Sequence, residues 1–446
     1  MSLGFRILLL SVIVLVGYLI YNACITKPKA LSFSLNDEEG VVNEPFFWDL
    51  EKPIKVKITA QKGVKSYMLK AVTEDNLVLY EKENLVLDKP KTLEVPLVKP
   101  EIMGLENKRI TYEIEANDWS YANFFNGNKA SFKREVSIDT TKPLITILSH
   151  SPSIAYGGSA LVVFEAIDRN LSKVFVRVKK RDFEAFRLLD YQKRHIFVAL
   201  VPWSYEIKDF KAFIVAKDKA NNSSTTPLLL KRKTHHLKEK DIDIALLKNK
   251  ILKQGIFQKK LSESNYEQAL LEMLSTARQK DLANIEQMAL KQGMFYSDFS
   301  SFQAFMPFNE PFKITGHFLE SRRFLKDTQV LFKFFHLGVD LRPKKDLSLA
   351  FNNAYKRVFK GKLDFYGDSL LNCYGLGLCA FFTHLNPFSN DKEVLGNSGL
   401  RLAYGLHFGM LLQGVFVRPN EWLNQKWINT NIITPLEQAR RILTKE

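Results

Sequence analysis

The sequence predicts a mainly β protein with an apolar helix at its N-terminus and a helical segment between its β-rich parts. Short alternations of apolar and polar residues recur from about residue 31 and are separated by Pro, Gly, Asn and Asp, a pattern typical of strands with one buried face. Many of the 34 phenylalanines lie in such runs, which favours sheets over long helices. Uncharged, mostly apolar residues fill positions 7–25, a length that can span a bilayer as a helix.

The chain is long enough for several domains and is strongly basic. Its 446 residues exceed one ordinary domain, so we expect about two to four domains. The formal net charge of +16 favours contact with acidic peptides or anionic lipid. The basic residues do not form a stripe interleaved with aromatic side chains, and we therefore expect no nucleic-acid binding.

Residues 1–30 are predicted to be a membrane anchor or a signal segment. The apolar stretch is long for a signal-peptide core. We therefore favour an uncleaved helix in the inner membrane, with the remaining chain exported to the periplasm. Cys24 offers an alternative as a lipidated cysteine, but Tyr21 and Asn22 stand where a lipoprotein signal has aliphatic and small residues.

Residues 31–138 and 139–232 are predicted to form two β-sandwich modules. The runs "PIKVKITA", "KTLEVPLV" and "RITYEIEAND" alternate as strands with one buried face do. The junction "IDTTKP" at 138–143 and the ending "AKDKANN" at 216–222 resemble the boundaries of bacterial immunoglobulin-like domains. That resemblance implies modules that bind, so an adhesion or assembly protein is one hypothesis for the whole chain.

Residues 233–300 are predicted to be a charged linker followed by a helix. His235 and His236 lie in "KRKTHHLKEKD", where solvated side chains are a better interpretation than metal ligands. Ser264 and Glu267 form a capping box that opens a helix, and one apolar face continues toward Gly293. We expect a hinge or strut here, and no chemistry.

Cys373 and Cys379 flank the turn-forming run "YGLGL" and lie symmetrically about its central leucine. They are predicted to face each other across a strand pair. Two interpretations stay open. The cysteines form a disulfide, as an oxidising compartment allows, or they are two small buried residues without a bond.

Residues 301–446 are predicted to be a β-rich domain in which histidines gather. The run "FFHLGVDLR" at 334–342, taken as a strand, places His336 and Asp340 on one face with a glycine between them. Imidazole and carboxylate ligands suit Zn²⁺, and a catalytic zinc needs three protein ligands and one open position. His407 in "GLHFG" is the natural third ligand, and His384 in "AFFTHLN" would lie at the rim. Each histidine taken alone is more often a structural residue.

The order of five motifs between about residues 316 and 422 resembles that of the lysostaphin- and LytM-like zinc metalloendopeptidases, which cut peptide cross-bridges in bacterial cell walls. The resemblance covers about a quarter of the chain. The motifs are, in order, "GHFLESRRF", "HLGVDL", "FKGKLDFYGDSLL", "GLGLCAFFTHL" and "GNSGLRLAYGLHFGMLLQGVFVRPNEWL".

The resemblance implies a role for each matched position. His336, Asp340 and His407 match the zinc ligands of the family, and His384 matches the histidine that positions the attacking water or stabilises the oxyanion. Gly405 stands where the family has the first histidine of its H-x-H motif, the general base. Because residues 405 and 407 of a strand share a face, a side chain at 405 is expected to project into the metal site.

These positions predict an exported, membrane-anchored, zinc-binding protein that contacts peptidoglycan stem peptides. Without the general base we expect impaired catalysis and a role as a scaffold or regulator of other cell-wall hydrolases, and thus in cell shape. The alternative is an active endopeptidase in which His384 is the catalytic partner. Arg322 and Arg323 could pair with substrate carboxylates through their guanidinium groups, or could be a solvated loop pair.

Overall fold

The computed structural model of the protein describes every residue except 1–2, 25–30, 36–45, 102–103, 105–107, 189–193, 235, 249–265, 346, 387–393, 396–404 and 446. His235 of the charged linker therefore lies outside the described residues, and so does Ser264 of the expected capping box. The chain divides into two compact units, Met1–Lys142 with Lys217–Ser223 and Pro143–Ala216 with Ser224–Glu446. Each unit is described by itself.

The first unit begins with the apolar helix α1 (Leu3–Cys24), and its segment Leu3–Tyr21 has a mean hydropathy of 2.5 and exposes its side chains. Length and composition allow this helix to be a membrane anchor or a signal sequence. A β-sandwich follows, and its two sheets enclose one apolar core. The three-stranded sheet contains β1 (Leu31–Leu35), β3 (Lys55–Ala60) and β6 (Thr92–Pro96). The five-stranded sheet contains β2 (Phe46–Trp48), β8 (Lys129–Ile138), β7 (Arg109–Asp118), β4 (Val64–Thr73) and β5 (Val78–Leu85), and the short helix α2 (Ala122–Phe125) connects β7 to β8.

The second unit starts with another β-sandwich, made of two four-stranded sheets around a shared core. One sheet has the order β14 (Phe186–Arg187), β15 (Ile196–Pro202), β11 (Ser159–Ile167) and β9 (Leu144–His150). The other has the order β13 (Arg181–Glu184), β12 (Leu171–Val178), β16 (Ala212–Asp218) and β17 (Ser223–Leu228), and the short strands β10 (Ser153–Ala155) and β18 (Lys231–Lys233) pair in parallel. Both units are built mainly of strands, so the prediction of a mainly β protein is confirmed. The expected alternation of buried and less buried residues is present, for example along β7 of the first unit.

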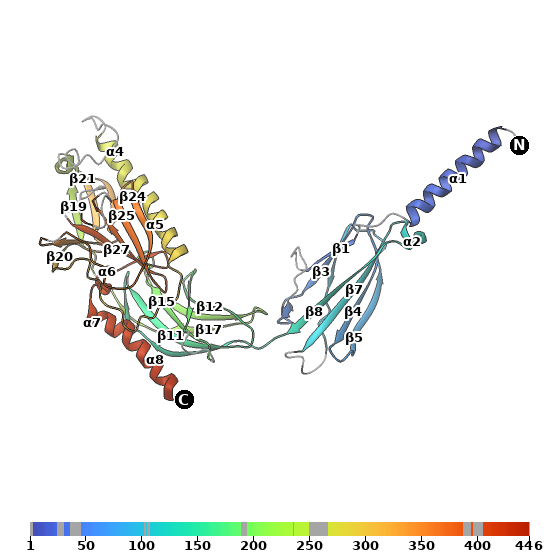
Figure 1. Ribbon diagram of the computed structural model, residues 1–446, viewed down its shortest axis with the longest axis horizontal. Helices are drawn as coiled ribbons and strands as arrows, with labels where there is room; N and C mark the ends of the chain where they lie inside the picture. Colours follow the sequence, from blue (N-terminus) through green and yellow to red (C-terminus); the bar gives the residue numbers. More distant parts are fainter. Residues whose placement is uncertain are drawn as a thin grey trace. The chain divides into compact units, whose positions relative to one another are not determined.

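The rest of the second unit is a β domain with helices packed on it (Figure 1). Its seven-stranded sheet has the order β20 (Phe312–Gly316), β23 (Val339–Pro343), β27 (Leu406–Leu412), β26 (Leu378–Thr383), β25 (Gly367–Gly375) and β24 (Lys356–Leu363), and β28 (Val415–Val417) pairs with β27. A smaller sheet joins β19 (Glu239–Asp243), β21 (Ser321–Lys326) and β22 (Gln329–Phe335).

Helices surround the C-terminal sheet. The predicted helical segment is present as α4 (Tyr266–Glu272), the π-helical turn η1 (Met273–Ala277) and α5 (Arg278–Gln292), and α5 contacts β24, β25 and β27 (Figure 1). The chain closes with α6 (Pro419–Trp422), α7 (Gln425–Ile428), η2 (Asn429–Ile433) and α8 (Thr434–Lys445), which contacts β9 and β11 of the sandwich. One continuous core includes residues of that sandwich and of the C-terminal domain.

Two details of the C-terminal domain bear on the sequence predictions. Cys373 and Cys379 are directly opposite in the pairing of β25 with β26, and they form a disulfide. The prediction of one strand over residues 334–342 is wrong, because β22 ends at Phe335 and β23 begins at Val339. The three residues between them carry the chain from the sheet of β21 to the sheet of β20 and β27, and one straight strand cannot belong to both sheets.

Candidate metal centre

Three side chains converge at the point where the chain passes between the two sheets. His336 lies in the connection after β22, Asp340 is in β23, and His407 is in β27, opposite Asp340 in the strand register. Together they are a group of buried metal-ligating residues whose ligand atoms lie within 4.8 Å of one another. The structure therefore brings together the three residues that the sequence predicted as metal ligands, although His336 is not on the expected strand.

The distances between the donor atoms suit a small tetrahedral ion. His336 Nε2 lies 2.8 Å from His407 Nδ1 and 3.1 Å from Asp340 Oδ1, and His407 Nδ1 lies 3.4 Å from that oxygen. In a tetrahedral zinc site with bonds of about 2.05 Å, neighbouring ligand atoms lie about 3.3 Å apart. Two imidazoles and one carboxylate also form a donor set that zinc accepts, so the residues fit this metal.

Glycines make the close approach of these side chains sterically feasible. A Cβ atom at Gly338 would lie 2.5 Å from His407 Cε1, and one at Gly316 would lie 2.2 Å from Asp340 Oδ2. A larger residue at either position would displace a ligand side chain. Gly338, the glycine of "HLGVD", is therefore needed because the imidazole of His407 occupies the space where a Cβ atom would lie.

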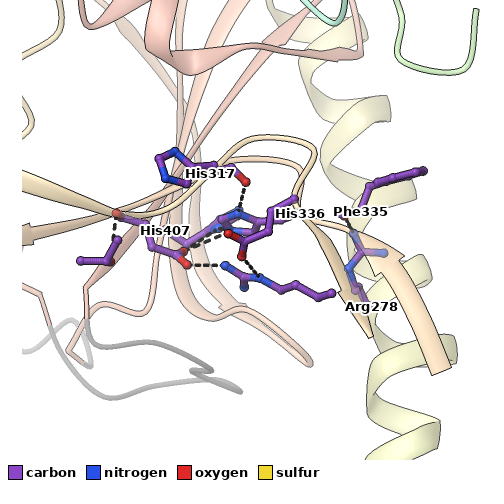
Figure 2. A network of polar contacts seen from close by, with 9 residues as sticks. Arg278, His317, Phe335, His336 and His407 are labelled. Carbon is purple, nitrogen blue, oxygen red and sulfur yellow. Dashed lines mark hydrogen bonds and ion pairs between the residues drawn. The ribbon is translucent and has the colours of Figure 1, made fainter. Parts of the chain in front are cut away.

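A backbone hydrogen bond fixes the orientation of the first ligand. The nitrogen Nδ1 of His336 lies 2.9 Å from the carbonyl oxygen of His317 (Figure 2). Because a carbonyl only accepts, Nδ1 carries the proton and Nε2 keeps its lone pair for the centre of the cluster. Such a contact behind a ligand sets its tautomer and raises its basicity.

The Arg322 guanidinium holds the carboxylate ligand from the other side. Its Nη2 donates to Asp340 Oδ2 at 2.6 Å, and its Nε donates to Glu320 Oε1 at 3.2 Å, all among buried side chains. This leaves Asp340 Oδ1 facing the two histidines. The interpretation of Arg322 as part of a solvated loop pair is wrong, because it is buried on strand β21.

The neighbouring arginine points elsewhere. Arg323 donates to Asp241 Oδ1 at 2.6 Å and lies 3.2 Å from Glu239, both on the adjacent strand β19. Successive residues of a strand face opposite sides of a sheet, so the structure does not bring the two arginines to one site. Both guanidinium groups are already engaged with carboxylates of this chain.

Burial and charge set the protonation of the three ligands. Burial lowers the pKa of His336, and it lowers the pKa of His407 to about 4. Burial alone would raise the pKa of Asp340, but the adjacent His336 and Arg322 hold it well below its ordinary value. The cluster therefore presents two neutral imidazoles and one carboxylate, and His407 Nε2 is buried without a hydrogen-bond partner among the described residues.

His384 belongs to the same small cavity. This cavity has a volume of about 20 Å³, which is room for one water molecule or ion, and His384 lines it together with the three ligands. The ring centroids of His384 and His407 are 6.3 Å apart. The sequence prediction placed His384 at the rim, and the structure buries it in the wall.

Gly405 differs from the expectation that residues 405 and 407 share a strand face. Strand β27 begins only at Leu406, and Gly405 has a φ of +146°. A Cβ atom at this position would lie 2.6 Å from the carbonyl oxygen of Leu341. With this backbone, a side chain at 405 would be directed at the neighbouring strand, so the assumption of a continuous strand does not hold here.

Two further polar residues, Arg278 and Tyr366, line the cavity and were not identified from the sequence. Arg278 comes from the first position of α5, and Tyr366 from the turn between β24 and β25. The Tyr366 ring lies 5.3 Å from the His407 ring at an interplanar angle of 31°. Tyr366 is part of the quoted motif "FKGKLDFYGDSLL" and could have been found there. Arg278 carries no sequence signal, because its helix lies far from the motifs along the chain.

Comparisons with known proteins return structures but no sequence families. No family model matches the chain, and no curated protein matches it. A Pseudomonas aeruginosa structure assigned to peptidase M23 is 15% identical, with a TM-score of 0.34 over 62% of this chain and 97% of that one. A zinc-containing peptidase from Vibrio cholerae is 10% identical, with a TM-score of 0.23 over 70% and 80%. A three-Ig segment of titin is 14% identical, with a TM-score of 0.21 over 48% and 72%. The assignment of the metal centre therefore rests on the geometry of the site.

Proposed function

We propose that the chain is an exported, membrane-anchored cell-wall protein whose C-terminal domain binds zinc and peptidoglycan stem peptides with impaired hydrolysis. In this proposal it acts as a scaffold or regulator of other cell-wall hydrolases in the periplasm. The observation that supports it is the convergence of His336, Asp340 and His407 as two neutral imidazoles and one carboxylate. The apolar helix α1 supports the anchor.

The impaired activity follows from what surrounds this donor set. Bound zinc would supply an activated water with a pKa of about 7 and a polarised carbonyl. A positioned general base contributes a further factor of about 10² to 10⁴ in rate, and Gly405 offers no side chain for that role.

The position of His384 supports a second candidate function, an active zinc endopeptidase. His384 lines the cavity with the ligands, so it could accept the proton of a water molecule held there. In that case the domain would hydrolyse peptidoglycan cross-links despite Gly405. An adhesion function of the β-sandwich modules would instead require neither metal nor hydrolysis.

One experiment separates these functions. The purified full chain in detergent is assayed for zinc content and for release of muropeptides from cross-linked peptidoglycan, beside His407→Ala and His384→Ala variants. His236→Ala is the control, because His236 is exposed. The proposal predicts one zinc per chain, its loss in His407→Ala only, and little release.

Each other result points to a different function. Release by the native chain that disappears in His384→Ala would establish the active enzyme instead. No zinc in the native chain would refute both metal-dependent functions and leave the β-sandwich modules as the functional part.

A further inference from the structure

A larger cleft of the second unit lies where the β-sandwich meets the C-terminal domain. Its volume is about 380 Å³, a size typical of sites that bind small organic molecules. The sandwich contributes Lys233 of β18, and the C-terminal domain contributes His317, Arg418 and Glu421 among others. The candidate metal ligands do not line this cleft, so it is a separate site.

Hydrogen bonds between the two parts hold the wall of the cleft in place. The backbone N–H of Arg418 donates to the carbonyl oxygen of Gly157 at 2.7 Å. Glu421 Oε2 accepts hydrogen bonds from the backbone N–H of Ser159 at 3.0 Å and from its hydroxyl at 3.3 Å. Glycine at 158 permits this approach, because a Cβ atom there would lie 2.3 Å from Glu421 Oε1. The cleft is therefore formed without a ligand.

The guanidinium of Arg418 is positioned in this wall but is not neutralised. Its Nη2 donates to the carbonyl oxygen of Tyr156 at 3.0 Å, and its central carbon lies 5.9 Å from the centroid of the Phe318 ring. Burial lowers the pKa of Arg418, and the charge of Glu421 opposes this only in part. Arg418 forms no ion pair with the described residues, which leaves its charge available to an anion.

The charges of the ionisable residues that line the cleft do not cancel. Lys233 and Arg418 are positive, and Glu421 contributes at most one negative charge, because burial raises its pKa to about 7. His317 is uncharged, since its Nε2 lies 3.1 Å from Lys238 Nζ, which can only donate. The sum therefore lies between +1 and +2, and an anion would lower it.

We infer that this cleft binds the carboxylate end of a short peptide, with the carboxylate at Arg418 and Lys233. The inference rests on the proposed function, which assigns stem peptides to the C-terminal domain, and it names the place where such a peptide binds. Guanidinium and ammonium groups form strong charge-assisted hydrogen bonds to carboxylates. Glu421 in the same wall repels a doubly charged phosphate more than a singly charged carboxylate.

The rest of the lining suits the body of a peptide. Asn420 and Asn424 line the cleft with side-chain amides, whose N–H groups can donate to peptide carbonyls. Trp427 adds an aromatic ring, which offers a flat apolar surface to a small side chain. A pocket for an apolar ligand alone would not need this mostly polar lining.

His317 connects the cleft to the candidate metal centre. Its side chain lines the cleft, and its backbone carbonyl oxygen lies 2.9 Å from His336 Nδ1 (Figure 2). A peptide in the cleft would therefore contact the segment that orients His336. Because the metal ligands are not part of the cleft, peptide binding does not require the metal.

The test is isothermal titration calorimetry of the full chain in detergent with acetyl-D-alanyl-D-alanine and with its C-terminal amide, which lacks the charge. Arg418→Met and Lys233→Met each remove one cation of the cleft. Lys231→Met is the matched control, because it removes the same charge from the same strand outside the cleft. We expect affinity for the free acid to fall about tenfold in Arg418→Met, and the amide to bind about tenfold more weakly than the acid. Lys233→Met should cause a smaller loss, and Lys231→Met should cause none.

The other outcomes separate the ligand, the cleft and the metal site. Equal affinity for acid and amide would overturn the role of the carboxylate, and unchanged affinity in both cleft variants would overturn the cleft as the site. Tighter binding of inorganic phosphate or of glucuronic acid would overturn the choice of a peptide. If Arg418→Met does not fold, Lys233→Met decides, because Lys233 is exposed. Zinc without peptide binding would refute this inference alone, whereas peptide binding without zinc would refute only the metal-dependent part of the proposed function.

Discussion

The first β-sandwich and the C-terminal domain both bury carboxylates, but they surround them differently. Asp118 in the first sandwich is fully buried and accepts bonds from Ser120 and Asn128, residues close to it along the chain. Asp340 in the C-terminal domain instead contacts Arg322, His336 and His407, which come from three separate elements. The hydrogen bonds of Asp118 hold the two ends of the connection between β7 and β8 together.

This contrast distinguishes a buried polar group with a structural role from one in a candidate functional site. At Asp118, hydrogen bonds from Ser120 and Asn128 outweigh the effect of burial and lower the carboxyl pKa. Residues close to Asp118 along the chain supply the hydrogen bonds that its carboxylate accepts. At the metal centre the polar atoms gather from distant elements, and His407 Nε2 and Arg278 Nε lack partners among the described residues. Buried polar groups without partners are costly, so such a cluster points to a missing ligand.

The largest effect is expected for Asp340→Ala, with Asp118→Ala as its matched counterpart. Removing one member of a buried ionic network costs about 3–5 kcal/mol, and Asp340→Ala would also remove a metal ligand. We expect loss of stoichiometric zinc and a lower free energy of unfolding. Asp118→Ala should lower stability by about 1–3 kcal/mol and leave zinc unchanged. Metal analysis and urea unfolding measure both, and zinc loss in both variants would contradict the comparison.

Glu421 provides a buried carboxyl of a third kind, at the contact between the second sandwich and α6. Burial raises its pKa to about 7, although bonds from the Ser159 backbone N–H and hydroxyl oppose this, and the charges of Arg418 and Lys233 oppose it too. Between the ordinary carboxyl pKa and about 7, the folded state keeps a proton that the unfolded state has lost. The free energy of unfolding therefore falls as the pH rises through this window, by roughly 3 kcal/mol in total.

Glu421→Gln should remove that pH dependence, because glutamine does not titrate. The thermal midpoints of native and variant chains are compared at pH 5 and pH 8, with Glu437→Gln on the exposed side of α8 as the control. The native chain and the control should lose stability at pH 8 relative to the Glu421→Gln variant. Equal pH profiles for all three proteins would show that this carboxyl does not titrate in the window.

Gly405→His tests whether the backbone or only the side chain differs from an active site. The family motif would be restored in sequence, but the φ of +146° and the carbonyl of Leu341 oppose any side chain. Strain of this kind costs about 1–3 kcal/mol, so we expect lower stability and no gain of peptidoglycan hydrolysis. Gly104→His is the control, since Gly104 has a φ of +71° and open space around it. A stable, hydrolytic Gly405→His chain would mean that the backbone adapts.

The smallest effect is expected on the surface of the first sandwich. Lys133 Nζ lies 2.7 Å from Glu113 across two neighbouring strands, and both side chains are exposed. Exposed ion pairs contribute about 0–1 kcal/mol. Lys133→Ala should therefore change the urea midpoint little and leave zinc content unaltered. A decrease of more than about 2 kcal/mol in the free energy of unfolding would show that this surface pair contributes as much as the buried cluster.

The local elements and the candidate ligand types could be predicted from the sequence. Alternation predicted the strands, because each strand buries every second residue, and the apolar run at 7–25 predicted helix α1. The candidate ligands His336, Asp340 and His407 could be predicted to lie together because of their residue types and the order of the motifs.

Which elements contact one another could not be predicted from the sequence, because it depends on tertiary packing. The expected strand ends at Phe335, and a side chain at Gly405 would be directed at the carbonyl oxygen of Leu341. Arg278 of α5 lines the cavity. The tertiary structure also joins Arg322 to Asp340 and separates it from Arg323. Periodicity reports whether a residue is buried, but contacts between distant segments depend on how whole sheets and helices pack. That packing is not written in any one stretch of the chain.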